Sequence, residues 1–155
     1  LEGSDFRGGV KRDLVAQFRV PQGRHVYASP ATQGMIAVDI ILDPCEGLVQ
    51  RPMIRPSPEK HRLAGTDEVF DVHHGAFELR MPLTVNSAAK GDITISGQVV
   101  WQSCNDEICD IPVRKRFEMT VPVKPSLPHP VRTARGAELE PNAAAHFKKM
   151  TDRRK

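Results

Sequence analysis

The sequence predicts an all-β domain built as an antiparallel sandwich, and three observations support this prediction. Short segments in which apolar and polar residues alternate recur along the chain, with the period of two expected of half-buried strands. Turn-forming residues separate these segments at short intervals, since the 155 residues include 13 prolines and 11 glycines. No strand alternates with a helical segment in the manner of βαβ units. The pattern indicates about seven or eight strands in one domain of ordinary size.

Composition and charge exclude two classes of function. No stretch approaches the ~20 apolar residues of a membrane span. The net charge of +3 comes from 22 basic and 19 acidic residues, and no basic stripe interleaved with aromatic residues marks a nucleic-acid surface. The chain begins without Met or a signal peptide, so we expect a mature or excised fragment.

The chain is expected to have three parts. Residues 1–9 are predicted to be disordered or introduced by cloning, and residues 10–124 to form the domain. Residues 125–155 follow as a Pro-rich linker and a basic tail. Within this C-terminal extension, 141–150 has two interpretations, a short helix that starts at Pro141 or a solvated tail.

The first half of the domain contains three expected strands and one irregular stretch. Alternation over 14–20 predicts the first strand, and 25–27 follows a glycine turn as a short second strand. The apolar run 35–42 is expected to form a central strand covered on both sides. Three prolines in 51–67 favour an edge strand or an irregular connection there.

The second half contains the clearest strands. Residues 77–85 alternate throughout, and Pro82 predicts an edge position or a bulge because proline has no amide hydrogen to donate. Two further alternating segments, 93–101 and 117–123, flank a pair of cysteines. We therefore expect a β-hairpin whose turn carries the cysteines, at the loop end where scaffolds usually present their chemistry.

The cysteine turn is the candidate functional site. Cys104 and Cys109 are separated by four residues, and a hairpin turn makes a disulfide between them one option. A loop this short removes little entropy from the unfolded chain, which weakens the argument that a bridge is mainly structural. We interpret the pair as a redox site. Cys45, the third cysteine, is expected to be a non-catalytic thiol.

Two other interpretations remain open. In one, the chain is an interaction module without redox activity and the same cysteines form a structural bridge. In the other, His73 and His74 bind a metal together with a cysteine. Adjacent strand residues point to opposite faces, and the cysteine spacing lacks the pattern of structural zinc sites, so we expect neither a metal nor a cofactor.

The cysteine motif and two further segments resemble a known family. The motif is Trp101-Gln102-Ser103-Cys104, a four-residue spacer, Cys109 and then Pro112. It resembles the N-terminal periplasmic domain of the transmembrane disulfide reductase DsbD. The resemblance includes Gly23-Arg24-His25-Val26-Tyr27 and the segment 79–86, and it spans roughly residues 14 to 123. It implies that the sandwich has an immunoglobulin-like topology.

The resemblance also implies roles for individual residues. Cys109 would attack the disulfide of a partner and Cys104 would resolve the mixed disulfide. An aromatic residue on a loop covers the cysteines in the family, and Phe70 is the candidate for it here. In the alternative interpretation, Phe70 is a core residue of a short strand. The environment of the site is expected to include Asp67, Glu68, Tyr27, Trp101 and Asp106.

The same resemblance implies partners and a compartment. Thioredoxin-like protein domains and a membrane electron-transfer protein of the DsbD type are the expected partners, in the periplasm or another exported location. The sequence departs from the family at Asp110, which puts a charge directly after the second cysteine. Together with Asp106 and Glu107 it is expected to disfavour a thiolate by repulsion, which suits a guarded pair that reacts inside a complex.

Overall fold

The structure is a computed structural model that describes residues 1, 3, 5–32, 34–86, 89 and 91–126. All regular elements of these residues are β-strands, and the segment 141–150 lies outside them. The strands are β1 Phe6–Arg7, β2 Lys11–Arg19, β3 His25–Tyr27, β4 Asp39–Leu42, β5 Leu48–Gln50, β6 Glu59–Arg62, β7 Val69–His73, β8 Ala76–Val85, β9 Gly91–Trp101, β10 Ser103–Cys104 and β11 Val113–Lys124. None of the described residues form a helix long and apolar enough to span a bilayer.

Two sheets face one another and enclose the main core. One has the strand order β1-β11-β9-β4 and the other the order β2-β8-β5. Alternation along each strand turns every second side chain inward. The buried residues of this core are Phe6, Leu14, Val26, Val38, Ile40, Leu79, Met81, Leu83, Val85, Ile93, Ile95, Val121 and Val123. The predicted all-β, immunoglobulin-like sandwich is confirmed.

The first strand starts earlier than expected. Phe6 is fully buried in the core, and β1 pairs in parallel with the end of β11, where Phe6 lies opposite Val123. Residues from Phe6 onward therefore contribute to the sandwich, although we placed the start of the domain at residue 10. A two-residue strand is too short to show the alternation that identifies longer strands.

Two expectations about strand position differ from the structure. The apolar run 35–42 yields only the four-residue β4, which is an edge strand, and Ile41 on it is 43 % exposed. The strand with the internal proline, β8, is the centre of its sheet. β8 tolerates Pro82 because the pairing with β5 ends at Leu83, so no amide hydrogen is needed from Pro82. The Pro82 carbonyl accepts a hydrogen bond from the Arg51 amide at 2.9 Å.

The expected hairpin is confirmed and leads to the cysteines. β9 and β11 pair in antiparallel register from Gly91 opposite Val123 to Trp101 opposite Val113. Residues 102–112 connect them. The short strand β10 within this connection does not continue the hairpin, because it joins a third sheet with the order β10-β3-β7-β6.

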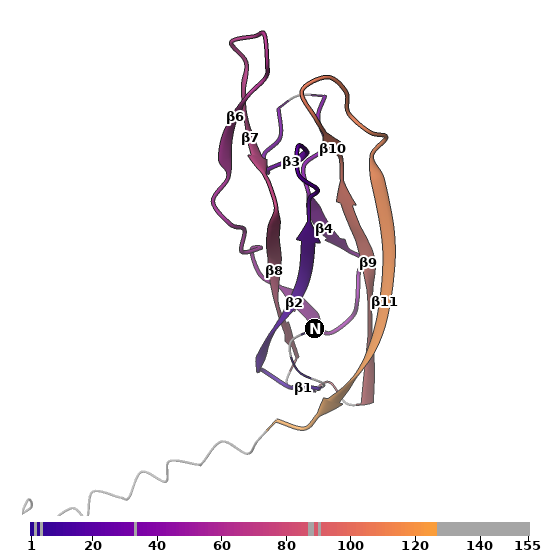
Figure 1. Ribbon diagram of the computed structural model, residues 1–155. Helices are drawn as coiled ribbons and strands as arrows, with labels where there is room; N and C mark the ends of the chain where they lie inside the picture. The colour runs from indigo at the N-terminus through magenta and orange to yellow at the C-terminus, as the bar shows by residue number, and fades with distance from the viewer. Residues whose placement is uncertain (2, 4, 33, 87–88, 90, 127–155) are drawn as a thin grey trace, which may run out of the picture.

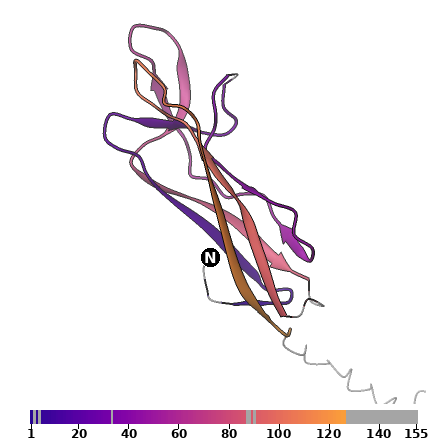
Figure 2. The ribbon, with the colours of Figure 1, turned by 90° about the vertical axis from the view of Figure 1, so that its right-hand side faces the viewer.

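The third sheet and the cysteine connection lie at one end of the sandwich. In Figure 1 the β6–β7 hairpin and the loop after β9 both extend beyond the two main sheets at the top, and Figure 2 shows them at the same end after rotation. β1 and the end of β11 lie at the opposite end. The molecule thus presents the cysteines at an end formed by residues distant in sequence.

Candidate functional site

Cys104 and Cys109 form a disulfide that closes a compact turn, with their Cα atoms 4.0 Å apart. The side chain of Asn105 shapes the turn, because its Oδ1 accepts hydrogen bonds from the amides of Glu107 and Ile108 at 2.9 and 2.7 Å. The Asn105 amide donates to the Ile108 carbonyl at 3.0 Å. Asparagine favours such turns because its side chain replaces a backbone acceptor.

Arg24, the residue before β3, anchors the turn to the rest of the domain. Its guanidinium donates to Ser103 Oγ at 2.7 Å and to the Ser103 carbonyl at 3.1 Å. It also forms an ion pair with Asp110. Gln102 supports the other side, since its Nε2 donates to the Asp110 carbonyl at 3.1 Å. The charge that follows the second cysteine therefore has a basic partner.

The two sulfurs differ in exposure. Cys104 is fully buried, whereas Cys109 is half-buried and follows Ile108, which is 64 % exposed. Cys104 belongs to a second apolar cluster, separate from the main core, whose buried members are Tyr27, Phe70, Val72 and Cys104. A partner that approaches from solvent therefore meets the second cysteine first.

The strand register explains which side chains surround Cys104. Cys104 lies directly opposite His25 in the antiparallel β10–β3 pair, so both side chains are on the same face. His25 and Tyr27 are two residues apart on β3 and share that face. The pairings of β3 with β7 and of β7 with β6 extend the face across the sheet. It carries Cys104, His25, Tyr27, Val72, Phe70 and His61.

Three histidines gather on this face beside the cysteine turn. The ring centroid of His25 lies 4.4 Å from that of His61 and 5.9 Å from that of His74. His61 Nε2 is 2.7 Å from Asp106 Oδ1, so the cluster touches the turn between the two cysteines. His74 Nδ1 lies 3.1 Å from the Arg24 carbonyl. The buried His25 ring is thus linked to the half-exposed Asp106 through His61.

Burial shifts the pKa values of two groups on this face, His25 and Tyr27. The pKa of His25 is lowered from its ordinary value, first because burial disfavours the imidazolium and then because His61 and His74 lie close. The pKa of Tyr27 is raised, mainly by burial and secondarily by the charge of Glu68. Both shifts favour the neutral forms of the two side chains.

The structure brings some of the predicted site residues together and separates others. Tyr27 and Phe70 pack in the cluster of Cys104, and Asp106 lies in the cysteine turn. Phe70 is on strand β7 and not on a loop, because Phe70 and Val72 alternate inward there. Asp67 and Glu68 lie in the exposed β6–β7 turn, where Asp67 pairs with Arg62 at 2.8 Å.

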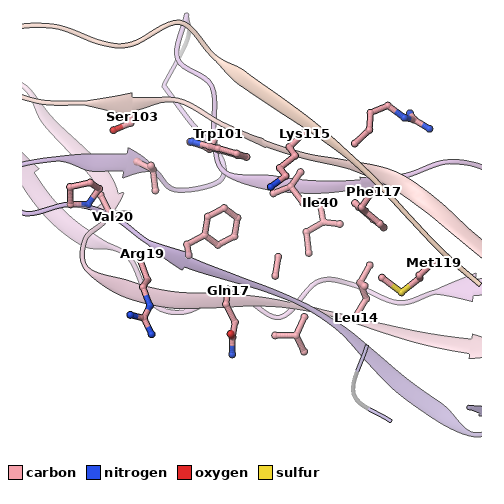
Figure 3. A pocket seen from close by; sticks show the side chains of 17 residues that line it. Leu14, Gln17, Arg19, Val20, Ile40, Trp101, Ser103, Lys115, Phe117 and Met119 are labelled. Atoms are coloured by element: carbon pink, nitrogen blue, oxygen red, sulfur yellow. The ribbon is translucent and has the colours of Figure 1, made fainter. Parts of the chain in front are cut away.

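Trp101 lies on the main core and not in the cysteine cluster. Its ring stands edge-on to that of Phe18, with centroids 6.2 Å apart. Both line a cavity of about 520 Å³ between β2, β9 and β11. Figure 3 shows Trp101 and Phe117 directed into this space, while Arg19 and Gln17 point away from it. Neither cysteine of the pair lines the cavity, although Ser103, which precedes Cys104, does.

The geometry gives no support to the metal interpretation. His73 packs against Phe77, with ring centroids 4.7 Å apart, whereas His74 contacts His25 and His61. Among the described residues, no group of three or more His, Cys, Asp or Glu side chains has the arrangement to hold a metal ion.

Cys45 is separate from the cysteine pair. It is a half-buried free thiol whose Sγ lies 3.4 Å from the Thr94 carbonyl oxygen, and it packs on the main core. Among the described residues, Cys45 is a member of the main-core cluster and not of the cluster around Cys104. Its position agrees with the expectation of a thiol outside the redox site.

Sequence reasoning missed the histidine cluster and Arg24. The segment with His25 had two interpretations, an ordinary strand or, as the family resemblance implies, a segment near the active-site end, and His61 was not considered. The signal available was the spacing of His25 and Tyr27, which puts them on one face of a strand. The sequence held no sign that β10 would pair with β3 and bring Cys104 opposite His25.

An all-β sandwich with a partly exposed disulfide in an end loop, separate from the main core, defines a class of domains that present a cysteine pair on a rigid scaffold. Residues 5–122 match the family model of the N-terminal domain of the thiol:disulfide interchange protein DsbD. The chain belongs to this family, which confirms the resemblance drawn from the cysteine motif.

One solved structure similar to this chain is the N-terminal periplasmic domain of ScsB from Proteus mirabilis. The two share 11 % sequence identity with a TM-score of 0.45, and the comparison covers 94 % of this chain and 50 % of that one. The chain thus spans about half the length of the ScsB domain. No curated protein matches the chain.

Proposed function

We propose that this protein is an exported thiol–disulfide exchange domain that relays reducing equivalents through reversible oxidation of Cys104 and Cys109. Membership in the DsbD N-terminal family supports the reaction class. Thioredoxin-like domains are the proposed partners, together with a membrane electron-transfer protein of the DsbD type. The proposed compartment is the periplasm, where an exposed disulfide persists.

The observation that carries this proposal is the unequal burial of the two sulfurs. Exchange needs one accessible sulfur to form the mixed disulfide and a second one nearby to resolve it. Cys109 is half-buried beside exposed residues, and Cys104 is fully buried within reach of it. We therefore assign the attack on the partner to Cys109 and the resolving step to Cys104.

Exposed apolar side chains beside Cys109 support a protein partner. Ile108 precedes the cysteine and is 64 % exposed, and Ile111 follows two residues later and is 87 % exposed. Such side chains gain free energy when a partner covers them. A partner that binds there would have its own cysteine next to Cys109 Sγ.

The acidic residues of the turn are largely paired. Asp110 forms an ion pair with Arg24, and Asp106 is hydrogen bonded to His61 at 2.7 Å. Pairing reduces the repulsion that these carboxylates exert on a thiolate, which we expected to be strong from the sequence. The turn is therefore compatible with a thiolate at Cys109 inside a complex.

Trapping of the mixed disulfide tests the proposed function. In the Cys104→Ser variant the resolving sulfur is absent, so Cys109 should accumulate a disulfide-linked adduct with an oxidised thioredoxin-like protein. The matched Cys109→Ser variant keeps only the buried sulfur and should form little adduct. Equal adduct from both variants, or none from either, would contradict the assignment of roles.

The competing interpretation is an interaction module in which the bridge is structural. It predicts that the disulfide resists a thioredoxin-like reductant until the domain unfolds, because a structural bridge is reached only after unfolding. Reduction of the wild-type protein by thioredoxin under native conditions, monitored by mass spectrometry, distinguishes these two interpretations. Rapid reduction supports exchange, and resistance supports the structural bridge.

A further inference from the structure

The resolving step, in which Cys104 attacks Cys109, requires that the Cys104 thiol transfer its proton to another group. After Cys109 forms a mixed disulfide, Cys104 must lose its thiol proton before it attacks, since the thiolate is the nucleophile. Cys104 is fully buried in the apolar cluster with Tyr27, Phe70 and Val72. In the disulfide form Cys104 has no solvent-exposed surface, which favours a protein group over water as the acceptor of the proton.

His25 is the titratable side chain opposite Cys104 in the strand register, and burial favours its neutral form. It lies directly opposite Cys104 in the β3–β10 pair, and such side chains share a face with Cβ atoms about 4.5–5.5 Å apart. His25 is only 2 % exposed. Within the part of the chain that the structure describes, its ring makes aromatic contacts and neither of its nitrogens has a hydrogen-bond partner.

A route leads from His25 to solvent. The His61 ring lies 4.4 Å from that of His25, centroid to centroid, and His61 Nε2 contacts Asp106 Oδ1 at 2.7 Å. The side chain of Asp106 is 47 % exposed. The three groups come from β3, β6 and the cysteine turn, so their alignment arises only in the folded domain.

We propose that His25 is the base that accepts the proton of Cys104 during the resolving step, and that His61 and Asp106 pass this proton to solvent. This inference rests on the proposed function, in which Cys104 is the resolving cysteine.

The proposed reaction transfers two electrons from the cysteine pair to the partner disulfide in two steps. The Cys109 thiolate attacks the partner disulfide, forms the mixed disulfide and releases the first partner thiolate. The Cys104 thiol then gives its proton to the neutral His25 imidazole, and its sulfur attacks Cys109 Sγ. The Cys104–Cys109 disulfide forms, the bond from Cys109 to the partner breaks, and the second partner sulfur leaves as a thiolate. The pair loses two electrons and the partner disulfide gains them.

The charged and titratable groups around His25 favour its neutral form. His61 from β6, His74 after β7 and Arg24 before β3 all oppose a positive charge on the ring, as does burial, and Asp106 alone favours one. The lowered pKa of His25 keeps the imidazole free to accept a proton at pH 7. Tyr27, whose ring centroid is 5.5 Å away, retains its own proton.

A stopped-flow reaction with 5,5′-dithiobis(2-nitrobenzoate) separates the two steps. A reduced protein with the Cys45→Ser substitution, which removes the third thiol and is the reference background, should release one equivalent of the coloured thiolate when Cys109 attacks and a second when Cys104 resolves. The rate of the second phase should rise with pH and level off once His25 is neutral. Absence of the first phase contradicts the proposed function, whereas the second phase tests the base.

The His25→Phe variant removes the base and keeps an aromatic ring in the cluster. Its second phase should be about 100-fold slower at pH 7, which is the lower end of the range for general base catalysis. The rate should also keep rising into alkaline pH, since hydroxide must replace the imidazole. The matched control is His73→Phe, another buried histidine, which packs on Phe77 on the other face of the sheet. A His25→Phe variant with the wild-type rate and pH profile would overturn the proposal.

Two variants at less buried positions keep the test valid if His25→Phe fails to fold. His61→Gln removes a neighbour that opposes the charge on His25, so the pH midpoint of the second phase should move upward. Asp106→Asn removes the group that favours the charge, so the midpoint should move downward. Midpoints that stay at the wild-type value in both variants would exclude His25 as the titrating base.

Discussion

The ring of Phe70 stands edge-on to that of Tyr27, with centroids 5.6 Å apart and an interplanar angle of 79°. The pair lies in the same apolar cluster as Cys104. The two rings therefore cover the inner sulfur from within the third sheet. Phe70 thus lies on a strand and does not fold over the cysteines from a loop. We expect the protection of the disulfide from reductants to depend on the packing of these strands.

Removal of the Phe70 ring should expose the disulfide. We expect the Phe70→Ala variant to be reduced several-fold faster by dithiothreitol under native conditions, and to lose about 3–5 kcal/mol of stability. Phe77→Ala is the matched control, because Phe77 stacks on Phe18 in the main core with centroids 4.9 Å apart. If the Phe70→Ala and Phe77→Ala variants are equally stable and are reduced at the same rate, Phe70 has no specific role in shielding the disulfide.

The buried histidines predict a loss of stability in acid. Burial is the main reason why the pKa values of His25 and His73 are lowered from the ordinary 6.5. Below that pH the unfolded chain binds protons that the folded domain does not, so the free energy of unfolding should fall as pH drops from 6.5 to the folded pKa values. Urea unfolding at roughly pH 7.5, 6.5 and 5.5 measures this trend.

The His73→Gln variant isolates one contribution to this trend. His73 packs on Phe77, away from the cysteine turn, so the variant should show a shallower decline between pH 6.5 and the folded pKa. A wild-type stability that stays constant or increases on acidification would contradict the effect of burial on both histidines.

At Gly97 the backbone of β4 lies close to β9. A Cβ atom at this position would overlap the Ile41 carbonyl oxygen and lie 3.1 Å from Phe117 Cζ. We expect Gly97→Ala to cost about 1–3 kcal/mol through overpacking, measured by urea unfolding. Thr94→Ala on the exposed face of the same strand should cost less than half as much, and equal costs would show that the sheet adjusts freely.

Phe6 illustrates what local sequence patterns miss. The long strands β2, β8, β9 and β11 were predictable because apolar and polar residues alternate several times along each of them. Phe6 belongs to a two-residue strand that pairs in parallel with β11, from the other end of the chain. We expect Phe6→Ala to cost about 3–5 kcal/mol because the side chain is fully buried, whereas Val10→Ala, at a position 38 % exposed, should change the urea midpoint little.

The candidate site could also be predicted only in part from the sequence. The cysteine spacing and the two flanking strands predicted a redox turn at the end of a hairpin, and the structure has the disulfide there. The environment of Cys104 was less predictable, because it depends on the pairing of β10 with β3 in a different sheet. Trp101, the first residue of the motif, lies on the main core and not beside Cys104. Periodicity identifies the face of a strand but not the strand that covers it.

The reduction potential of the Cys104–Cys109 pair tests the central claim most directly. Folded protein is equilibrated with graded mixtures of thiol and disulfide, and free thiols are trapped and counted by mass. A reversible relay predicts a value in the range of exchange proteins, roughly −180 to −270 mV. A value below about −300 mV, without reduction of the native protein by a thioredoxin-like donor, would contradict the relay and identify a structural bridge.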